Sequence, residues 1–132
     1  MEISLVIEGK MPSLNELIAK TNHNKYGGNE FKQDIESDIK WQILKQIREK
    51  NIEHLLPLKN MADFEFTYIE ENKKRDKDNI ASSKKYLFDA LVRVGVIQND
   101  GWKWVGDFKE TFVIGSKYRV IIKIKEREGE TK

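Results

Sequence analysis

Hydrophobic and polar residues alternate in three parts of the chain, at residues 2–8, 62–68 and 112–124. A period of two residues places successive side chains on opposite faces of a strand, so each segment is expected to bury one face. In the last segment Gly115-Ser116-Lys117 interrupts the pattern, which predicts a hairpin of two arms. The first arm contains Phe112 and Ile114. The expected core-facing residues are Ile3, Leu5, Ile7, Ala62, Phe64, Phe66, Tyr68, Tyr118, Val120, Ile122 and Ile124.

A period of 3.6 residues predicts two longer helices, at about residues 30–51 and 79–94. The second helix is expected to begin at a cap formed by Asp78 or Asn79 and to end at Gly95. The apolar stripes of the two helices consist of Phe31, Ile35, Ile39, Ile43, Leu44 and Ile47, and of Leu87, Leu91 and Val94.

The segments between these elements have weaker signals. Ser13 and Glu16 have the spacing of a capping box, which predicts a short helix. Residues 21–29 are polar and rich in glycine, which is typical of a mobile loop, and the charged tail at 126–132 is expected to fray. The whole pattern predicts one α+β domain over residues 1–132. Its sheet is mainly antiparallel or mixed, has about four strands, and carries two longer helices.

The composition of the chain limits the cellular compartment and the kinds of binding partner that we expect. The chain contains no cysteine, which excludes disulfides and thiolate metal sites and favours a reducing, cytoplasmic compartment. No apolar run approaches the roughly 20 residues that span a bilayer, so no membrane partner is expected. The N-terminal residues carry an acid at Glu2 and no basic stretch, unlike a secretory signal. The net charge of +2 weakly favours an anionic partner.

Acidic and basic residues gather around the start of the second helix. Asp76 and Asp78 are two residues apart, so an extended segment would point both carboxylates the same way. Asp100 lies in a turn-forming loop just after the helix. Oxygen ligands of this kind suit Mg²⁺, and flanking cations would offset the repulsion between carboxylates and a phosphate backbone. The basic residues nearby are Lys73, Lys74, Arg75, Lys77, Lys84 and Lys85.

None of these features is specific by itself. An Asp-x-Asp pair is more often a solvated turn, and a basic run is usually a solvated surface. Their combination with the downstream Asn99-Asp100-Gly101 loop predicts a metal–phosphate site in general terms.

Taken together, the motifs between Lys74 and Val105 resemble the RusA family of Holliday junction resolvases. The N-terminal strand and the closing strands agree with the family more loosely, in order and length. The residues that carry the resemblance are Arg75-Asp76-Lys77-Asp78-Asn79-Ile80, Lys85, Phe88-Asp89-Ala90-Leu91, Gly95, Asn99-Asp100 and Trp102.

The resemblance implies a homodimer that cuts four-way DNA junctions symmetrically with Mg²⁺, for which Mn²⁺ would substitute, and with no organic cofactor. It carries the three catalytic, metal-binding aspartates onto Asp76, Asp78 and Asp100. It also implies roles in DNA recombination and repair, and family members often occur in phages and prophages. The chain has Asn99 where the family also allows an aspartate, a loss that Asp100 makes tolerable.

The catalytic lysine of the family would be Lys85, four residues before Asp89. Three extra residues before it leave the choice between Lys84 and Lys85 open by alignment alone. A continuous helix would place Asp78, Lys85 and Asp89 on one side and turn Lys84 away, which favours Lys85.

In the implied mechanism a metal-activated water hydrolyses the phosphodiester, and Lys85 stabilises the negative charge that grows on the phosphate. Asp89 and Asn79 are possible supporting residues, and Asp89 is expected to make an ordinary salt bridge rather than bind metal. The residues expected to contact DNA phosphates are Lys73, Lys74, Arg75, Lys77 and Lys84.

The predicted roles of the three tryptophans are less specific. Trp102 and Trp104 are expected to pack in the strand that follows the acidic loop, rather than to stack on bases. Trp41 falls off the apolar stripe of its helix, so it is expected either to contact a second copy or to cover a small apolar cluster.

Other classes of function compete with the resolvase. A nuclease for flaps or forks would differ mainly in dimer geometry, which the sequence does not show. A junction-binding module without catalysis is disfavoured because all three aspartates and Lys85 are retained. A structural or regulatory interaction protein is disfavoured because cations cluster around Asp76 and Asp78.

Overall fold

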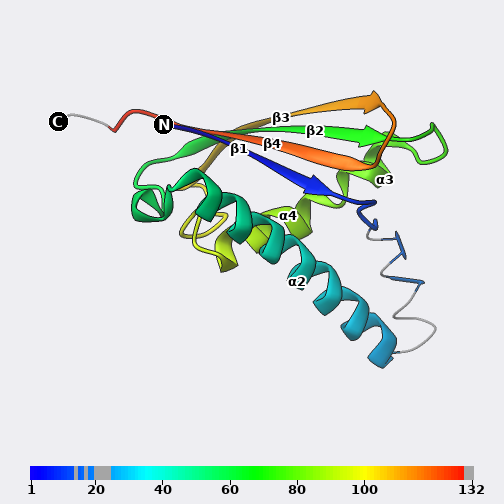
Figure 1. Cartoon of the computed structure of the whole chain (residues 1–132). Coiled ribbons are helices and arrows are strands. Elements are labelled where there is room, and N and C mark those ends of the chain that lie inside the picture. The colour runs from blue at the N-terminus through cyan, green and yellow to red at the C-terminus, as the bar shows by residue number, and fades with distance from the viewer. Residues whose placement is uncertain (14, 17, 20–24, 130–132) are drawn as a thin grey trace.

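The computed structural model describes residues 1–13, 15–16, 18–19 and 25–129. Within these ranges four strands form a single sheet in the order β1-β4-β2-β3 (Figure 1). β4 runs antiparallel to both of its neighbours, whereas β2 and β3 run parallel. The strands are β1 (Glu2–Glu8), β2 (Ala62–Glu70), β3 (Val105–Ile114) and β4 (Arg119–Glu126).

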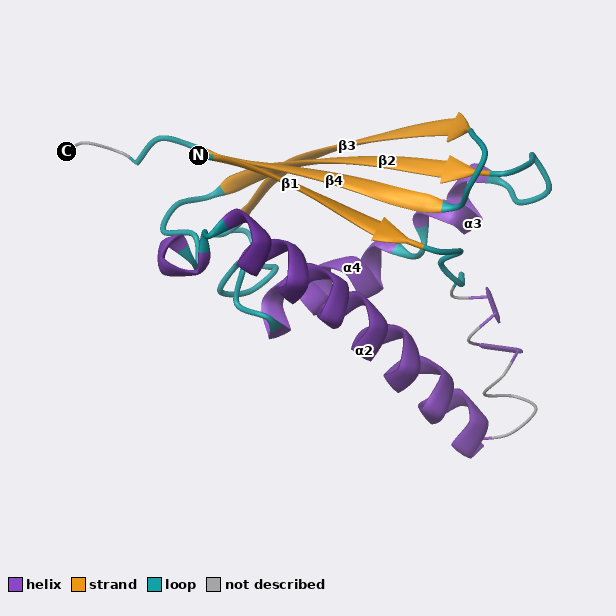
Figure 2. Cartoon of the chain, viewed as in Figure 1, coloured by secondary structure: helices purple, strands orange, loops and turns teal. Residues whose placement is uncertain are grey.

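The two longest helices, α2 (Lys25–Lys50) and α4 (Lys84–Arg93), lie against one face of this sheet (Figure 2). A short helix, α3 (Lys77–Ala81), follows the end of β2, and a 3-10 turn, η1 (Glu53–Leu55), follows α2. The expected α+β class, with a mixed four-stranded sheet and two helices packed on it, is therefore confirmed. Within the described ranges, none of the helices combines the length and apolar character needed to cross a bilayer.

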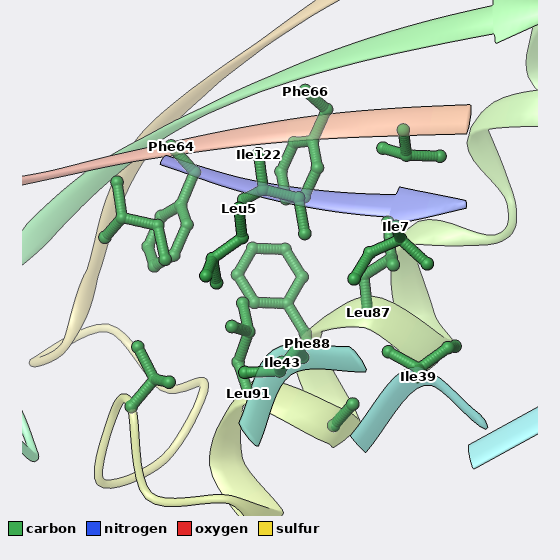
Figure 3. Packing of buried hydrophobic residues seen from close by; sticks show 14 of the residues in the cluster. Leu5, Ile7, Ile39, Ile43, Phe64, Phe66, Leu87, Phe88, Leu91 and Ile122 are labelled. Carbon is green, nitrogen blue, oxygen red and sulfur yellow. The ribbon is translucent and has the colours of Figure 1, made fainter. Parts of the chain in front are cut away.

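The core lies between the sheet and the two helices. The ring of Phe88 on α4 packs edge-on against Phe64 and Phe66 of β2, with ring centroids 5.1 and 5.4 Å apart. Such aromatic pairs add about 0.5–1.5 kcal/mol each beyond the area they bury. Strand residues predicted to face inward, such as Leu5 and Ile122, are fully buried in this layer (Figure 3). The hydrophobic alternation therefore identified the buried faces of β1, β2 and β4, but not of β3, where Ile114 is exposed.

The predicted C-terminal hairpin is wrong. A short connection, residues 115–118, joins β3 to β4, but the two strands do not pair, because β2 lies between them. β2 carries the buried aromatic ladder of Phe64, Phe66 and Tyr68. A strand with this much apolar surface is stabilised most at the centre of the sheet, where neighbours on both sides cover it. Alternation along one strand cannot show which strand becomes its partner.

The predicted helix at 79–94 is two helices separated by Ser82 and Ser83. The Ser82 hydroxyl donates to the Asn79 carbonyl at 2.6 Å, and the Ser83 hydroxyl donates to the Ile80 carbonyl at 2.9 Å. Such bonds compete with the helical ladder and favour a break. Asp76 occupies the N-cap position of α3, with no side-chain capping bond, so the expected cap at Asp78 or Asn79 is also wrong. Gly95 ends α4 as predicted, with a φ of 83°.

Two expectations at the chain's loops and tail are partly wrong. The helix α2 begins at Lys25, so the last part of the predicted loop at 21–29 is helical, and residues 21–24 lie outside the described ranges. Gly27 and Gly28 each cost about 1 kcal/mol relative to alanine in a helix, and the buried residues Ile39, Ile43 and Ile47 further along α2 stabilise the helix as a whole. Glu126 is the last residue of β4 rather than the start of a frayed tail, and residues 130–132 lie outside the described ranges.

Specific polar contacts fix this end of β4. The Glu126 carboxylate accepts hydrogen bonds from the backbone N–H groups of Lys59 and Asn60 at 2.8 and 3.0 Å. The next residue, Arg127, donates two hydrogen bonds to the Asp63 carboxylate, and this contact lowers the pKa of Asp63. The charge of the tail therefore pairs with β2 and the segment before it instead of facing solvent alone.

The outer edge of β1 is covered by two glutamine side chains from α2. The amide of Gln46 accepts from the Val6 N–H and donates to the Val6 carbonyl, both at 2.7 Å. The amide of Gln42 makes the same pair of bonds with Glu8, at 2.7 and 3.1 Å. The side chains therefore satisfy backbone groups that an edge strand otherwise leaves open.

Replacing Gln46 with alanine is expected to lower the free energy of unfolding by about 1–2 kcal/mol, because two hydrogen bonds to Val6 are lost. Urea denaturation followed by circular dichroism measures this change. The neighbouring exposed residue supplies the control, and Lys45→Ala is expected to change stability by less than about 0.5 kcal/mol. Equal effects of the two substitutions would contradict a stabilising role for the glutamine.

Candidate functional site

The candidate residues are positioned where the chain leaves β2 and enters α3 (Figure 1). Asp76 has an extended backbone at the N-cap of α3, and Asp78 lies in the first turn of that helix. The expected extended Asp-x-Asp segment is therefore half helical. The two carboxylates nevertheless line one hollow of about 310 Å³, which we call the acidic hollow, formed by Asn15, Asp76, Asp78, Asn79 and Ser82.

The acidic hollow is lined largely by oxygen-bearing side chains. The Asp78 carboxylate accepts a hydrogen bond from the Asn79 N–H at 2.9 Å. The Asn15 amide donates to the side-chain oxygen of Asn79 at 3.3 Å, which joins the segment after β1 to α3. Asp76 and Asp78 are both exposed, so their carboxylates are accessible to a ligand from solvent. Carboxylate and amide oxygens are the donors that hard cations prefer.

Asp100 reaches the same region from the other end of α4. Together with Asp78 it lines a second hollow of about 490 Å³, which we call the lysine hollow. Asp78 and Ser82 belong to both hollows, so the two adjoin. The residues of the lysine hollow are Asp78, Ala81, Ser82, Lys84, Lys85, Phe88 and Asp100.

The two lysines of this hollow differ in their surroundings. The Lys84 ammonium is bonded to the Glu110 carboxylate on β3 and lies 4.2 Å from the centre of the Phe108 ring. The side chain of Lys85 is 63% exposed, and its ammonium is 3.9 Å from the Asp89 carboxylate. Lys84 is therefore engaged in holding α4 on the sheet, whereas Lys85 is accessible to a substrate in the hollow.

Asp89 shares a different hollow with Asp100. These two carboxylates, together with Val92 and Arg93, line a third hollow of about 350 Å³. The contact with Lys85 is an ordinary i,i+4 pair on the surface of a helix, worth about 0.3–0.5 kcal/mol. Asp89 therefore does not join Asp76 and Asp78 in the acidic hollow.

The structure brings the three predicted aspartates around adjoining hollows but does not gather them at one point. Within the described ranges, no three acidic or histidine side chains are close enough together to hold a metal ion. The donor chemistry still fits Mg²⁺, because one or two carboxylates with water and substrate phosphate are its usual shell. Asp76 and Asp78, with the amide oxygens beside them, form the oxygen-rich part of the site.

Arg75 does not face the solvent, contrary to its expected role as a phosphate contact. Its guanidinium donates to both oxygens of Glu70 at 2.9 and 2.8 Å, and to the Met11 carbonyl at 2.6 Å. The side chains of Arg75 and Glu70 are only 11% and 8% exposed. A planar guanidinium suits such a two-point contact with a carboxylate. Arg75 therefore joins β2, the segment after β1 and the start of α3.

The other predicted basic residues near β2 stay at the surface. Lys73 and Lys77 are exposed and line a groove of about 410 Å³, which we call the basic groove. The Lys77 ammonium lies 5.7 Å from the centre of the Phe112 ring, and Lys74 is exposed beside the groove. The groove is lined by Glu70, Asn72, Lys73, Arg75, Asp76, Lys77, Ile80, Phe112, Val113 and Ile114, so Asp76 connects it to the acidic hollow.

Trp102 and Trp104, in the loop after α4, were both predicted to pack, but their environments differ. Trp104 is 9% exposed and packs as expected, but Trp102 is 96% exposed, so its predicted packing role is wrong. The Asn99 side-chain oxygen accepts from the Gly101 N–H at 2.8 Å, which closes a tight turn. This turn directs the chain outward at Trp102, next to Asp100.

Sequence reasoning missed three residues at this site. Glu110 binds Lys84 from β3, and Asn15 and Ser82 line the acidic hollow. Only pairing of β3 beside β2 places Glu110 near α4, and that pairing was not predicted. The capping spacing around Ser13 was the sole signal near Asn15.

Two tyrosines close to the site are buried rather than reactive. Burial raises the pKa of the Tyr68 phenol, and the charge of Glu110 acts in the same direction. Burial also raises the pKa of Tyr86, with smaller contributions from Glu16 and Glu36. Both phenols therefore stay protonated at neutral pH.

Comparison with known proteins adds no assignment: no protein-family model matches this chain, and no curated protein matches it significantly.

Replacing Arg75 with alanine is expected to lower the free energy of unfolding by about 3–5 kcal/mol, because the Glu70 carboxylate is left buried and unpaired. Urea denaturation measures the loss. Lys74→Ala removes the adjacent, exposed cation and is expected to have an effect below about 0.5 kcal/mol. An Arg75→Ala protein as stable as Lys74→Ala would mean that the buried fork contributes little.

Proposed function

We propose that this chain is a Mg²⁺-dependent, structure-selective DNA endonuclease that resolves four-way junctions, as its resemblance to the RusA family implies. One observation carries the proposal. Asp76, Asp78 and Asp100 come from both ends of the α3–α4 segment to two adjoining hollows, and the accessible ammonium of Lys85 belongs to the hollow that Asp78 and Asp100 line together. If Asp76 and Asp78 belonged only to an ordinary surface turn, nothing would require Asp100 to line the same hollow as Asp78.

Two further features support a nucleic-acid substrate. The basic groove carries the cations of Lys73 and Lys77 directly beside Asp76. Cations beside a carboxylate site lower the repulsion that phosphates would otherwise meet, and they provide affinity without sequence choice. Trp102 presents an exposed ring next to Asp100, and such rings serve as stacking surfaces for unpaired bases.

The roles of the residues follow from these positions. Asp76 and Asp78 would hold Mg²⁺ or Mn²⁺, with Asp100 facing them from the lysine hollow. The metal, when bound, supplies Lewis acidity and a water of lowered pKa. Lys85 would place its ammonium against the scissile phosphate and stabilise the charge that develops there. Asn79 orients this end of α3 through its bond to Asn15.

Two alternatives retain the same site. A nuclease with broader preference would cut flaps and forks as readily as junctions, and a binding module would hold branched DNA without cutting. Paired cuts in opposed strands require two equivalent sites, so the proposed activity requires a homodimer.

Asp76→Asn is expected to lower the rate of junction cutting by about a hundredfold or more while junction affinity stays within about threefold, because the flanking cations are unchanged. The assay uses a labelled four-way junction and the matching duplex, each with Mg²⁺ and with EDTA. Gel shifts in Ca²⁺ measure binding separately.

Several outcomes separate the alternatives. Mg²⁺-dependent, symmetric nicks on the junction alone support the resolvase, whereas similar rates on flaps support the broader nuclease. Binding without cutting by the unmodified protein supports the binding module. Unchanged cutting by Asp76→Asn would remove this aspartate from the site, and a lack of both binding and cutting would reject the proposal.

Lys85→Gln is expected to lower the cutting rate by about 10²–10³-fold, with junction affinity nearly unchanged, because its charge acts mainly on the transition state. Lys85→Arg keeps the positive charge and is expected to recover part of the rate. Lys45→Gln on the exposed surface of α2 removes the same charge away from the site and serves as the control. A loss shared equally by Lys85→Gln and Lys45→Gln would mean that only the overall charge matters.

A further inference from the structure

The side chain of Trp102 makes almost no contact with its own chain. It is 96% exposed, which is the highest value for a large apolar side chain among the described residues. Trp102 lies in the loop between α4 and β3, two residues after Asp100. An indole gains a large free energy when it is buried, and here its whole apolar face is available to a ligand instead.

Hydrogen bonds fix the loop on both sides of Trp102. Before it, the Asn99 side-chain oxygen accepts from the Gly101 N–H at 2.8 Å, and a Cβ at residue 101 would lie only 2.9 Å from that oxygen. After it, the Trp104 N–H donates to the Gly101 carbonyl at 3.0 Å, and the Trp104 carbonyl accepts from the Ala62 N–H at 3.0 Å. The loop is therefore anchored to the sheet before any ligand binds, which lowers the entropy cost of binding.

The surroundings of the ring favour a nucleotide over a protein surface. Residues 98–103 are all exposed, and Trp102 is the only apolar side chain among them. A protein interface usually surrounds such an anchor with further apolar area. Lys103, the next residue, instead carries an exposed cation, with its ammonium 5.1 Å from the centre of the Trp104 ring. A free aromatic face beside a cation suits a base that stacks and a phosphate that is negatively charged.

We propose that Trp102 stacks on an unpaired base at the branch point of the DNA and thereby gives the site its preference for branched over linear DNA. This inference rests on the proposed nuclease function and adds the part of the substrate that the loop recognises. In a linear duplex both faces of each base are covered by its neighbours, so the ring finds no free face. Where strands diverge, a base loses a neighbour, and stacking on it does not depend on its identity.

The position of Trp102 relative to Asp100 fits this role. Two residues span at most about 7 Å, so the Cα atoms of Asp100 and Trp102 are no further apart than this. Nucleotides follow one another at about 3.4 Å along a strand. A base on the Trp102 ring therefore belongs to a nucleotide only a few positions from a phosphate beside Asp100, which would direct cutting to the neighbourhood of the branch.

Trp102→Ala is expected to raise the dissociation constant for a four-way junction about tenfold and that for the matching duplex less than about twofold, because the duplex offers no free base. A fork with unpaired arms is expected to behave like the junction. Trp102→Phe keeps an aromatic face and is expected to recover part of the affinity. Fluorescence anisotropy of labelled DNA in Ca²⁺ measures each constant without cutting.

The matched control removes a different exposed indole. Trp41 on α2 is 62% exposed, and Trp41→Ala is expected to leave the ratio of the junction and duplex constants unchanged. An equal weakening of junction and duplex binding by Trp102→Ala would overturn the inference, since the ring would then not distinguish branched DNA.

Quenching of tryptophan fluorescence tests the contact with the loop intact, so it does not depend on how well Trp102→Ala folds. In a Trp41→Phe protein only Trp102 and Trp104 emit, and Trp104 is buried. Acrylamide is expected to quench this protein less in its junction complex than in the free protein or the duplex complex, because a stacked base covers the Trp102 ring. Equal quenching in the free protein and the junction complex would overturn the inference.

The two proposals fail in different ways. If the unmodified protein binds and cuts junctions and Trp102→Ala does so equally well, the stacking role is rejected and the nuclease proposal stands. If the unmodified protein binds no junction, both are rejected. A selective loss of junction affinity together with protection from acrylamide supports the assignment of Trp102 as the residue that recognises the branch.

Discussion

The buried fork of hydrogen bonds between Arg75 and Glu70 fixes the point at which the chain leaves the sheet. Glu70 is the last residue of β2, and Arg75 lies just before the cap of α3, so the pair closes the turn between them. The third bond of the guanidinium, to the Met11 carbonyl, ties the segment after β1 to the same place. The positions of Asp76 and Asp78 therefore depend on a cation that is itself withdrawn from solvent.

The second determinant is the pair of serines that divides the helical segment. If residues 77–93 formed one helix, Asp78 and Lys85 would be fixed by helical phase alone. Ser82 and Ser83 instead separate α3 from α4, and the side chains of Asp78 and Lys85 line one shared hollow. Lys84, one residue earlier, is held by Glu110 on β3. The sheet thus anchors α4 through one lysine and leaves the next one accessible to a ligand.

Sequence patterns predicted the parts of the fold that depend on local periodicity. The buried faces of β1, β2 and β4 follow from alternation, and the buried stripe of Ile39, Ile43 and Ile47 on α2 follows from the 3.6-residue period, because both patterns act within one element. Strand partners could not be predicted, since β2 separates β3 from β4 for reasons that involve all three strands. The three aspartates were predicted to be close together, and they surround adjoining hollows without meeting. Arg75 and Lys73 belong to the same basic run, so the sequence predicts the same role for both. The structure separates them, because Arg75 is bonded to the buried Glu70 whereas Lys73 is exposed. Trp102 and Trp104 likewise differ in exposure, which depends on the turn at Asn99–Gly101 and not on residue type.

The glutamine cover on β1 has a consequence for the size of any assembly. An open strand edge can in principle add copies without limit, and a sheet with two open edges can polymerise into a fibre. Here α2 supplies side-chain amides that imitate a neighbouring strand along β1, so the sheet can extend in one direction only. The same helix that completes the core therefore also opposes strand addition along β1.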